Sequence, residues 1–220
     1  MGTMELFKEL FSAFENREEA GQLLAKKLEH LKDKKPVILG LPRGGVIVAH
    51  EIATALNTEL DVVLARKLGA PDNPELAIGA ISEAGKVQLN YDIIETLGIP
   101  EEYIEMEKER QMEEIRRRAE IYRKVHPKIP LDGRVVVITD DGVATGATMK
   151  AAILGVQTEN PEKIVLAIPV GAQDVLDELQ KMVDELVYLK NPPFIGGVGQ
   201  FYVDFSQIDD NTVVNILQQS

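Results

Sequence analysis

The chain has 220 residues, of which 45% are hydrophobic, and its 36 acidic and 24 basic residues give a net charge of −12. This length allows one large domain whose core needs no covalent staples, and the lack of cysteine excludes disulfides, thiol nucleophiles and thiolate metal sites. The acidic excess argues against a general nucleic-acid-binding protein, which normally presents positive charge to phosphates.

The chain contains no apolar run as long as a membrane-spanning helix, and its first residues, MGTMELFKEL, lack the pattern of a signal peptide. We therefore expect a cytoplasmic protein that contacts neither a membrane nor nucleic acid. Its three histidines have no HExxH spacing, and Ser82 does not lie in a GxSxG sequence. These patterns leave no signal for a zinc hydrolase or an α/β-hydrolase.

The predicted elements alternate between helices and strands outside the middle of the chain. The first is a helix over residues 16–31, because Asn16 can cap it, Glu19 can complete a capping box, and leucines recur at helical spacing. The remaining elements are strand 36–41, helix 44–56, strand 60–65, strand 134–139, helix 147–157, strand 163–170, helix 172–183 and strand 185–189. This alternation predicts an α/β fold with a doubly wound parallel sheet, whose sites lie at the carboxyl ends of the strands.

The middle of the chain, residues 69–130, breaks this alternation. Its first part is turn-rich and has room for a small hairpin, and residues 100–127 predict a long charged helix. That helix should dock through one stripe and leave its charges in solvent; the stripe consists of Met112, Ile115, Ala119 and Tyr122. We expect a single domain with a core of about residues 35–68 and 131–190, a lid at 69–130, and a hood at 191–220 assisted by residues 1–34.

The stretch VVVITDDGVATGATM, residues 135–149, carries the chemistry. A helix N-terminus after a Gly-Thr loop is a ready anion site, to which Thr145 and Thr148 can add hydroxyl donors. Asp140 and Asp141 would repel a phosphate lodged against them, so they suit hydroxyl groups such as a ribose diol one step away. The alternative is a tight turn in which one of the two aspartates is a local cap.

Two familiar phosphate loops do not fit this chain. A P-loop requires Lys before its final Thr, and Ala147 occupies that position. A dinucleotide-binding loop requires GxGxxG after the first strand, whereas GLPRGG has a different glycine spacing.

VVITDDGVATGAT instead resembles the phosphoribosyl-pyrophosphate (PRPP) motif of type I phosphoribosyltransferases. Two further loops support the resemblance: LPRGG is similar to the family's pyrophosphate loop, and ARKLG is similar to the Arg-Lys pair of adenine-type members. The departures are mild, Thr139 at a usually apolar site and Gly142 where an aliphatic residue is commoner. Within the family, LGLPRGG and RKLG are typical of a poorly characterised group without a settled acceptor.

This resemblance implies a set of site residues. Asp140 and Asp141 would hold the ribose 2′- and 3′-hydroxyls and lie near a Mg²⁺ that rests mainly on PRPP oxygens and water. Arg66 and Lys67 would meet the diphosphate. The diphosphate loop would consist of Pro42, Arg43, Gly44 and Gly45, with a non-proline cis peptide bond between Pro42 and Arg43. The loop around the 5′-phosphate would consist of Gly142, Val143, Ala144, Thr145, Gly146, Ala147 and Thr148.

The resemblance also implies the reaction, Mg²⁺-dependent transfer of a phosphoribosyl group from PRPP to a nitrogen acceptor such as a nucleobase, with release of pyrophosphate. Ala144 replaces the carboxylate that oxopurine-using members usually carry. The candidate acceptor contacts are Phe194, Phe201, Tyr202 and Lys190, and the arginines taken as surface charges are Arg116, Arg117 and Arg123.

Two further expectations concern the class of protein and its assembly. The alternative function is a non-catalytic PRPP or nucleotide sensor, because binding alone needs only the PRPP loop. Dimers are common in the family, so we expect a homodimer. The stripe of Phe7, Phe11 and Phe14 or the one on the long charged helix is available for an interface, and each stripe could equally pack within one subunit.

Overall fold

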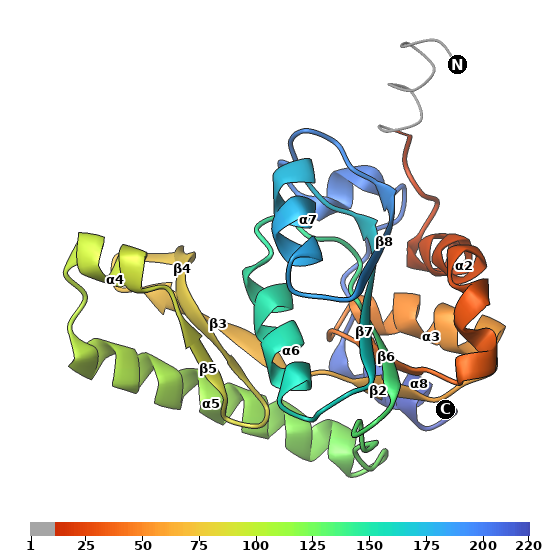
Figure 1. Cartoon of the computed structure of the whole chain (residues 1–220), viewed down its shortest axis with the longest axis horizontal. Coiled ribbons are helices and arrows are strands. Elements are labelled where there is room, and N and C mark those ends of the chain that lie inside the picture. The colour runs from red at the N-terminus through yellow and green to blue at the C-terminus, as the bar shows by residue number, and fades with distance from the viewer. Residues whose placement is uncertain (1–11) are drawn as a thin grey trace.

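The structure is a computed structural model, and it describes residues 12–220. Within this range, five parallel strands form the central sheet in the order β2-β1-β6-β7-β8 (Figure 1). The strands are β1 (Val37–Gly40), β2 (Leu60–Val62), β6 (Val135–Thr139), β7 (Lys163–Val170) and β8 (Glu185–Lys190). The doubly wound α/β fold predicted from the sequence is confirmed.

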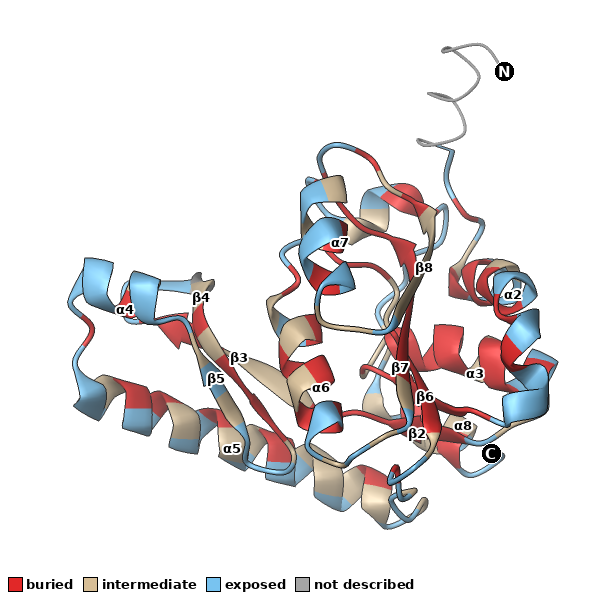
Figure 2. Cartoon of the chain, viewed as in Figure 1, coloured by how far each residue is buried: buried red, intermediate tan, exposed pale blue. Residues whose placement is uncertain are grey.

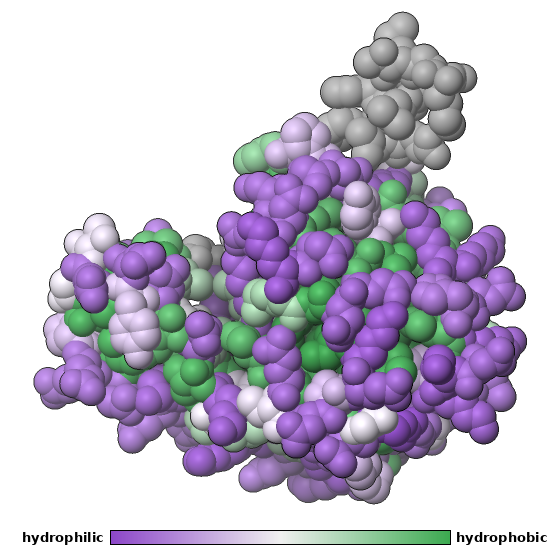
Figure 3. Space-filling model, viewed as in Figure 1, coloured by the Kyte–Doolittle hydropathy of each residue, from purple (hydrophilic) through white to green (hydrophobic). Residues whose placement is uncertain are grey.

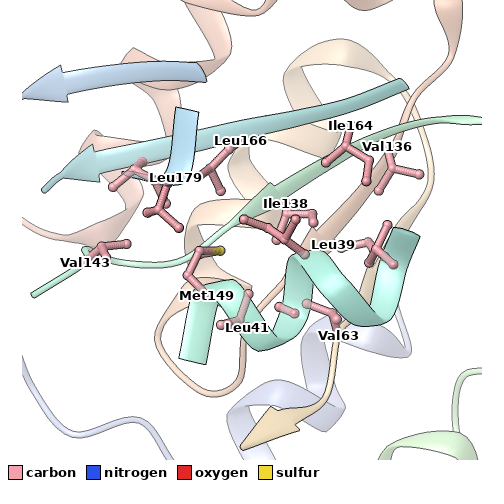
Figure 4. Packing of buried hydrophobic residues seen from close by; sticks show 14 of the residues in the cluster. Leu39, Leu41, Val63, Val136, Ile138, Val143, Met149, Ile164, Leu166 and Leu179 are labelled. Carbon is pink, nitrogen blue, oxygen red and sulfur yellow. The ribbon is translucent and has the colours of Figure 1, made fainter. Parts of the chain in front are cut away.

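Helices cover both faces of this sheet, because residues that alternate along each strand point to opposite sides. On one face, Leu39, Val136 and Ile138 pack against α6 (Ala147–Gln157) and α7 (Gln173–Gln180), as Figure 4 shows around Met149 and Leu179. On the other face, the intervening strand residues pack against α2 (Arg17–Lys27) and α3 (Gly45–Leu56). Buried residues accordingly line the strands and the inner sides of these helices (Figure 2).

The middle of the chain folds as a separate layer beside the core. Strands β3 (Ala65–Ala70), β4 (Asn73–Ser82) and β5 (Val87–Leu89) form an antiparallel sheet. Helix α4 (Tyr91–Leu97) follows, and the long α5 (Glu101–Arg123) runs beneath the sheet, as the left part of Figure 1 shows. The predicted hairpin is thus part of a larger sheet. The inserted sheet begins at Ala65, before the predicted boundary at residue 69.

Helix α5 packs on β3 and β4 of the inserted sheet and on α8 (Asp210–Leu217), through the predicted stripe. Ile115 and Tyr122 are fully buried, and Met112 and Ala119 pack against the same cluster. Its carboxyl end is tied down by Arg123, which donates hydrogen bonds to Asp61 of β2 and to Glu83 after β4.

The C-terminal hood forms around the N-terminal segment rather than standing alone. The Phe14 N–H donates to the Phe201 carbonyl at 2.7 Å, and the Val203 N–H donates to the Phe14 carbonyl at 2.8 Å. The 3₁₀ helix η2 (Val198–Phe201) lies in this hood, and helix α8 then packs on α3 and α5. Phe14 is therefore a hood core residue, whereas Phe7 and Phe11, the other predicted interface residues, lie outside the described residues.

Local sequence explains how the first helix begins. The Asn16 side chain accepts a hydrogen bond from the Glu19 N–H at 2.9 Å, as predicted, and the Glu19 carboxylate accepts from the Glu15 N–H at 2.6 Å. The helix ends at Lys27, and a 3₁₀ helix, η1 (Glu29–Lys34), continues the chain. Among residues 12–220, no helix is both long enough and apolar enough to cross a membrane.

Candidate functional site

The predicted diphosphate and PRPP loops meet at the carboxyl ends of β1 and β6, as parallel strands require. There they border a cleft of about 560 Å³ between the core and the inserted layer. Of the predicted site residues, the cleft is lined by Pro42, Arg43, Arg66, Lys67, Asp140 and Thr148. The cleft therefore collects residues from all three motifs that the sequence singled out.

The loop after β1 packs directly on the acidic pair, and only glycine fits at the contact. A Cβ on Gly44 would lie 2.0 Å from Asp141 Oδ2, and one on Gly45 would lie 2.7 Å from Asp140 Cα. The Pro42–Arg43 peptide bond is cis, as the resemblance implied. Helix α3 begins at Gly45, so its N-terminus points toward the same place.

The two aspartates have different surroundings. Asp140 lines the cleft, and its carboxylate accepts a hydrogen bond from the Asp141 N–H at 2.8 Å. Asp141 instead accepts a charged hydrogen bond from Arg17 Nε at 2.7 Å. Arg17 is only 7% exposed, donates through Nη1 to the Ser206 carbonyl at 3.0 Å, and stacks 3.8 Å from the centre of the Phe205 ring. Arg17 thereby joins α2, the acidic pair and the hood.

Electrostatics separates the pair further. Burial is the main reason that the pKa of Asp140 lies well above its ordinary value, and the negative charge of Asp141 adds to this increase. Burial also raises the pKa of Asp141, although the hydrogen bond from Arg17 opposes that effect. The surroundings of Asp140 thus make its ionisation less favourable than that of an exposed carboxyl group.

The loop after the aspartates forms a cradle at the start of α6. Gly146 precedes the helix with φ of 75°, a conformation that glycine adopts without strain. Ala144, Thr145 and Thr148 lie beside it, with Ala144 and Thr145 exposed to solvent. Val143 differs from its predicted role, because its N–H donates to the Val170 carbonyl at 2.8 Å and its side chain is buried in the core. The cradle therefore starts after Val143.

The two departures from the family motif have structural explanations. The Thr139 hydroxyl is buried and donates to the Ala167 carbonyl of β7 at 2.6 Å. At Gly142, a Cβ would lie 2.5 Å from Val198 of the hood, so a larger residue would push the hood away.

Arg66 and Lys67 reach the cleft from the inserted sheet. We expected them at the end of a core strand, but β2 ends at Val62, and both residues lie in β3. Arg66 Nε donates to Gln111 of α5 at 2.9 Å, and Gln111 in turn donates to Glu107 at 2.9 Å. Burial alone would raise the pKa of Glu107. Hydrogen bonds from Arg110, Gln111 and the Gly69 N–H outweigh that effect and lower the pKa.

The predicted acceptor residues do not gather at one surface. Phe201 is 1% exposed within the hood, and Lys190 is buried, with Nζ donating to Ser12 Oγ at 2.8 Å and lying 4.2 Å from the centre of the Phe14 ring. Tyr202 is also buried, and its hydroxyl donates to the Asp141 carbonyl at 2.6 Å. Because these three residues are buried in contacts that stabilise the hood, their positions do not favour contact with an acceptor base. Phe194, at 75% exposed, is the predicted ring that remains accessible.

Sequence reasoning missed two arginines of the site. Arg17 has no local signal, because its partner Asp141 is 124 residues away. Arg118 lines the cleft, whereas the exposed Arg116 and Arg117 do not. Arg118 follows Ile115 by three residues and precedes Tyr122 by four, so the predicted stripe could have placed it on the inner face of α5. Arg123 was taken as a surface charge, but it is the half-buried anchor of that helix.

Comparison with known proteins identifies the family of the chain. A family described as "Phosphoribosyl transferase domain" matches residues 12–206. The crystal structure of TT1426 from Thermus thermophilus is 45% identical, with a TM-score of 0.83 over 94% of this chain and 98% of that one. A protein of Mycobacterium tuberculosis, provisionally named a phosphoribosyl transferase and given for strains CDC 1551 and H37Rv, is 44% identical over 207 residues.

The matched part makes up 94% of this chain but 47% of the curated relatives, so the chain spans about half of their length. The match nevertheless includes all three motifs and both halves of the central sheet. The chain therefore belongs to the type I phosphoribosyltransferase family.

Proposed function

We propose that the protein transfers a 5-phosphoribosyl group from PRPP to a nitrogen acceptor, a nucleobase or a related compound, and releases pyrophosphate. The observation that carries the proposal is the cleft, whose lining brings Arg43 of the diphosphate loop together with Asp140 and with Thr148 of the phosphate loop. In the reaction, the bond between C1′ and the diphosphate oxygen breaks, and its electron pair leaves with pyrophosphate. The acceptor nitrogen forms the new bond to C1′ and loses its proton to water.

In this proposal each group in the cleft acts through charge. Asp140 accepts hydrogen bonds from the ribose hydroxyls, and its negative charge lies near the positive charge that develops at C1′. Arg43, Arg66 and Lys67 stabilise the leaving diphosphate. The amides from Ala144 to Thr148 hold the 5′-phosphate at the start of α6.

Asp141 has a different part in this scheme from the one that the resemblance implied. Its carboxylate is held by Arg17 and pressed against Gly44, and the lining of the cleft includes Asp140 instead. We infer that Asp140 binds the ribose and that Asp141 fixes the diphosphate loop against the acidic pair.

The residues of the cleft fit Mg²⁺ bound together with PRPP. Among the described residues, no group of three or more histidine or acidic side chains forms a complete metal site. Mg²⁺ commonly takes one or two carboxylates, with substrate phosphates and water as its other ligands. Asp140 would supply that carboxylate, and bound Mg²⁺ would offset part of the charge on the diphosphate.

Ala144 limits the acceptor. It is exposed in the 5′-phosphate loop and carries no group that could take a proton from an oxopurine. We therefore expect hypoxanthine and guanine to react at least ~100-fold more slowly than the best base in a panel with PRPP, the lower end of what a positioned proton acceptor contributes. Efficient turnover of either oxopurine would contradict this prediction.

The test of the proposed function is incubation with Mg²⁺, PRPP and a panel of bases, with pyrophosphate release and nucleotide formation measured together. We expect one or more bases to yield both products in equal amounts, and Asp140→Asn to abolish the reaction while the protein stays folded. Tight PRPP binding without turnover for any acceptor would favour the alternative, a non-catalytic sensor of PRPP or nucleotides.

A further inference from the structure

Helix α5 forms one wall of the cleft, and its inner face is set by helical geometry. The residues that line the cleft from this helix are Glu107, Arg110, Gln111, Ile115 and Arg118. Most neighbouring members are three or four residues apart, so they lie along one side of the helix. Arg118 is the member of this set nearest the anchored end.

The side chain of Arg118 is half-buried and incompletely paired. Its Nε is buried and has no hydrogen-bond partner within residues 12–220. A buried guanidinium N–H without an acceptor is unfavourable, and a ligand oxygen in the cleft would satisfy it. The next arginine toward the amino end, Arg117, instead pairs with Glu114 at 3.2 Å on the outer surface.

The cleft around Arg118 holds several positive charges with few nearby carboxylates. Arg43 and Arg66 line the same space. Its lining carboxylates are Asp140 and Glu107, and Glu107 is already paired with Arg110 at 2.7 Å. Burial lowers the pKa of Arg66, and the positive charge of Arg118 lowers it further. Cations that repel one another in a concave site favour an anion between them.

Arg118 also sits on a part of the helix that is fixed to the core. One turn later, the Tyr122 hydroxyl donates to Asp210 of α8, and Arg123 binds Asp61 and Glu83. Arg118 and Arg43 of the diphosphate loop both line the cleft. Arg118 therefore lines the same cleft as the diphosphate loop from an anchored part of the helix.

From this geometry we propose that Arg118 binds the diphosphate of PRPP and of the product pyrophosphate, in the cleft that Arg43 and Arg66 also line. This inference rests on the proposed function and adds a binding residue to it. The inserted layer then contributes a fixed wall of the diphosphate site in addition to covering it.

The test compares Arg118→Gln with Arg116→Gln, a matched control on the exposed side of the same helix. Calorimetry with inorganic pyrophosphate and with ribose 5-phosphate distinguishes the two ends of PRPP. We expect Arg118→Gln to weaken pyrophosphate binding at least tenfold and ribose 5-phosphate binding less than twofold. Arg116→Gln should change neither affinity by more than twofold, and Arg118→Lys should recover part of the loss because it restores the charge.

Two results would overturn the proposal. One is pyrophosphate affinity in Arg118→Gln within twofold of wild type, and the other is an equal loss for both ligands, which would indicate a general change in the site. Thermal unfolding of each variant shows whether it is folded. Wild-type protein that binds pyrophosphate but transfers no phosphoribosyl group would refute the proposed function alone, because the comparison of the variants would still stand.

Discussion

At the scale of single residues, the two neighbouring aspartates are chemically unequal. Asp140 faces the cleft, while Asp141 is neutralised by Arg17 and supports the glycines of the diphosphate loop. In the proposed function, this pair of adjacent carboxylates is thus divided: Asp140 contacts the substrate and Asp141 supports the loop. Two isosteric substitutions can separate these tasks.

We expect Asp140→Asn to raise the melting temperature and Asp141→Asn to lower it. The first change removes a buried charge and keeps an oxygen that can accept from the Asp141 N–H. The second leaves the buried Arg17 without a charged partner, at a cost of about 1–3 kcal/mol. Thermal unfolding at pH 7 measures both effects, and a lower melting temperature for Asp140→Asn would contradict the assignment.

The effect of Asp140 on stability should also depend on pH. The pKa of Asp140 is higher in the folded state than in the unfolded state. Its favourable contribution to the free energy of unfolding is therefore complete at a pH below the pKa of the unfolded state, and it is lost as the pH rises through the pKa of the folded state. The gain from Asp140→Asn should therefore be largest at pH 8 and shrink as the pH falls. Melting curves of both proteins between pH 4 and pH 8 would show a constant difference if the site were unperturbed.

Gly44 allows a second residue-scale prediction. In Gly44→Ala the new Cβ would collide with Asp141 Oδ2 and lie 2.7 Å from Arg17 Nε, so the diphosphate loop must move. Overpacking of this kind costs about 1–3 kcal/mol. Gly197→Ala is the control, because nothing lies within 4 Å of its Cβ and its backbone is extended, and it should change stability by less than about 0.5 kcal/mol. Urea unfolding measures both variants, and equal stabilities would refute the contact.

At the scale of elements, the sequence predicts best where the signal is local. Helix α6 and strand β7 have the predicted bounds, because an apolar run between turn residues determines each of them. The first residue of strand β3 was predicted to belong to a strand of the core sheet. The local sequence does not show its true pairing, because its partners in β4 are up to 17 residues away. Helices α4 and α8 were missed, although Asp209 caps α8 by accepting from the Thr212 N–H at 2.8 Å.

The same limit applies to the site. The phosphate cradle and the aspartates follow one another in the chain, so the motif could be read directly. The Arg17–Asp141 pair and the burial of Phe201 against Phe14 join residues from distant parts of the chain, and no periodicity encodes them. A pattern in one sequence indicates which residues are available for chemistry, but tertiary packing decides which of them face the ligand.

The anchor of α5 gives a prediction at this scale. Arg123→Gln would leave Asp61, which is 1% exposed, without its cation, and breaking such a buried pair costs about 3–5 kcal/mol. Arg134→Gln, which breaks an exposed pair with Glu59, should cost less than about 1 kcal/mol. Urea unfolding compares the two. A loss in Arg123→Gln no larger than that in the control would show that the anchor contributes little.

At the scale of the whole molecule, a protein with a net charge of −12 keeps a positively charged cleft between two layers. A second hollow, of about 860 Å³, lies between the inserted sheet and α6 and borders the other side of the 5′-phosphate loop. The face in Figure 3 is largely hydrophilic, with hydrophobic residues between the inserted layer and the core. The 5′-phosphate loop thus borders two hollows, the cleft and this second one, and ligand binding should distinguish them.

Hydrogen exchange over the whole chain can make that distinction. We expect PRPP to slow exchange in residues 41–45 and 140–148 and on α5 near Arg118. Each of these segments contributes lining residues to the 560 Å³ cleft, and in the proposed function residues 144–148 hold the 5′-phosphate. Pyrophosphate alone should protect residues 41–45 and α5 but leave residues 144–148 unchanged, since it lacks the 5′-phosphate. Helix α8 serves as the internal control, because it packs behind the cleft on α3 and α5. Protection concentrated instead on β5 and α4 would place the ligand in the second hollow and contradict the proposed site.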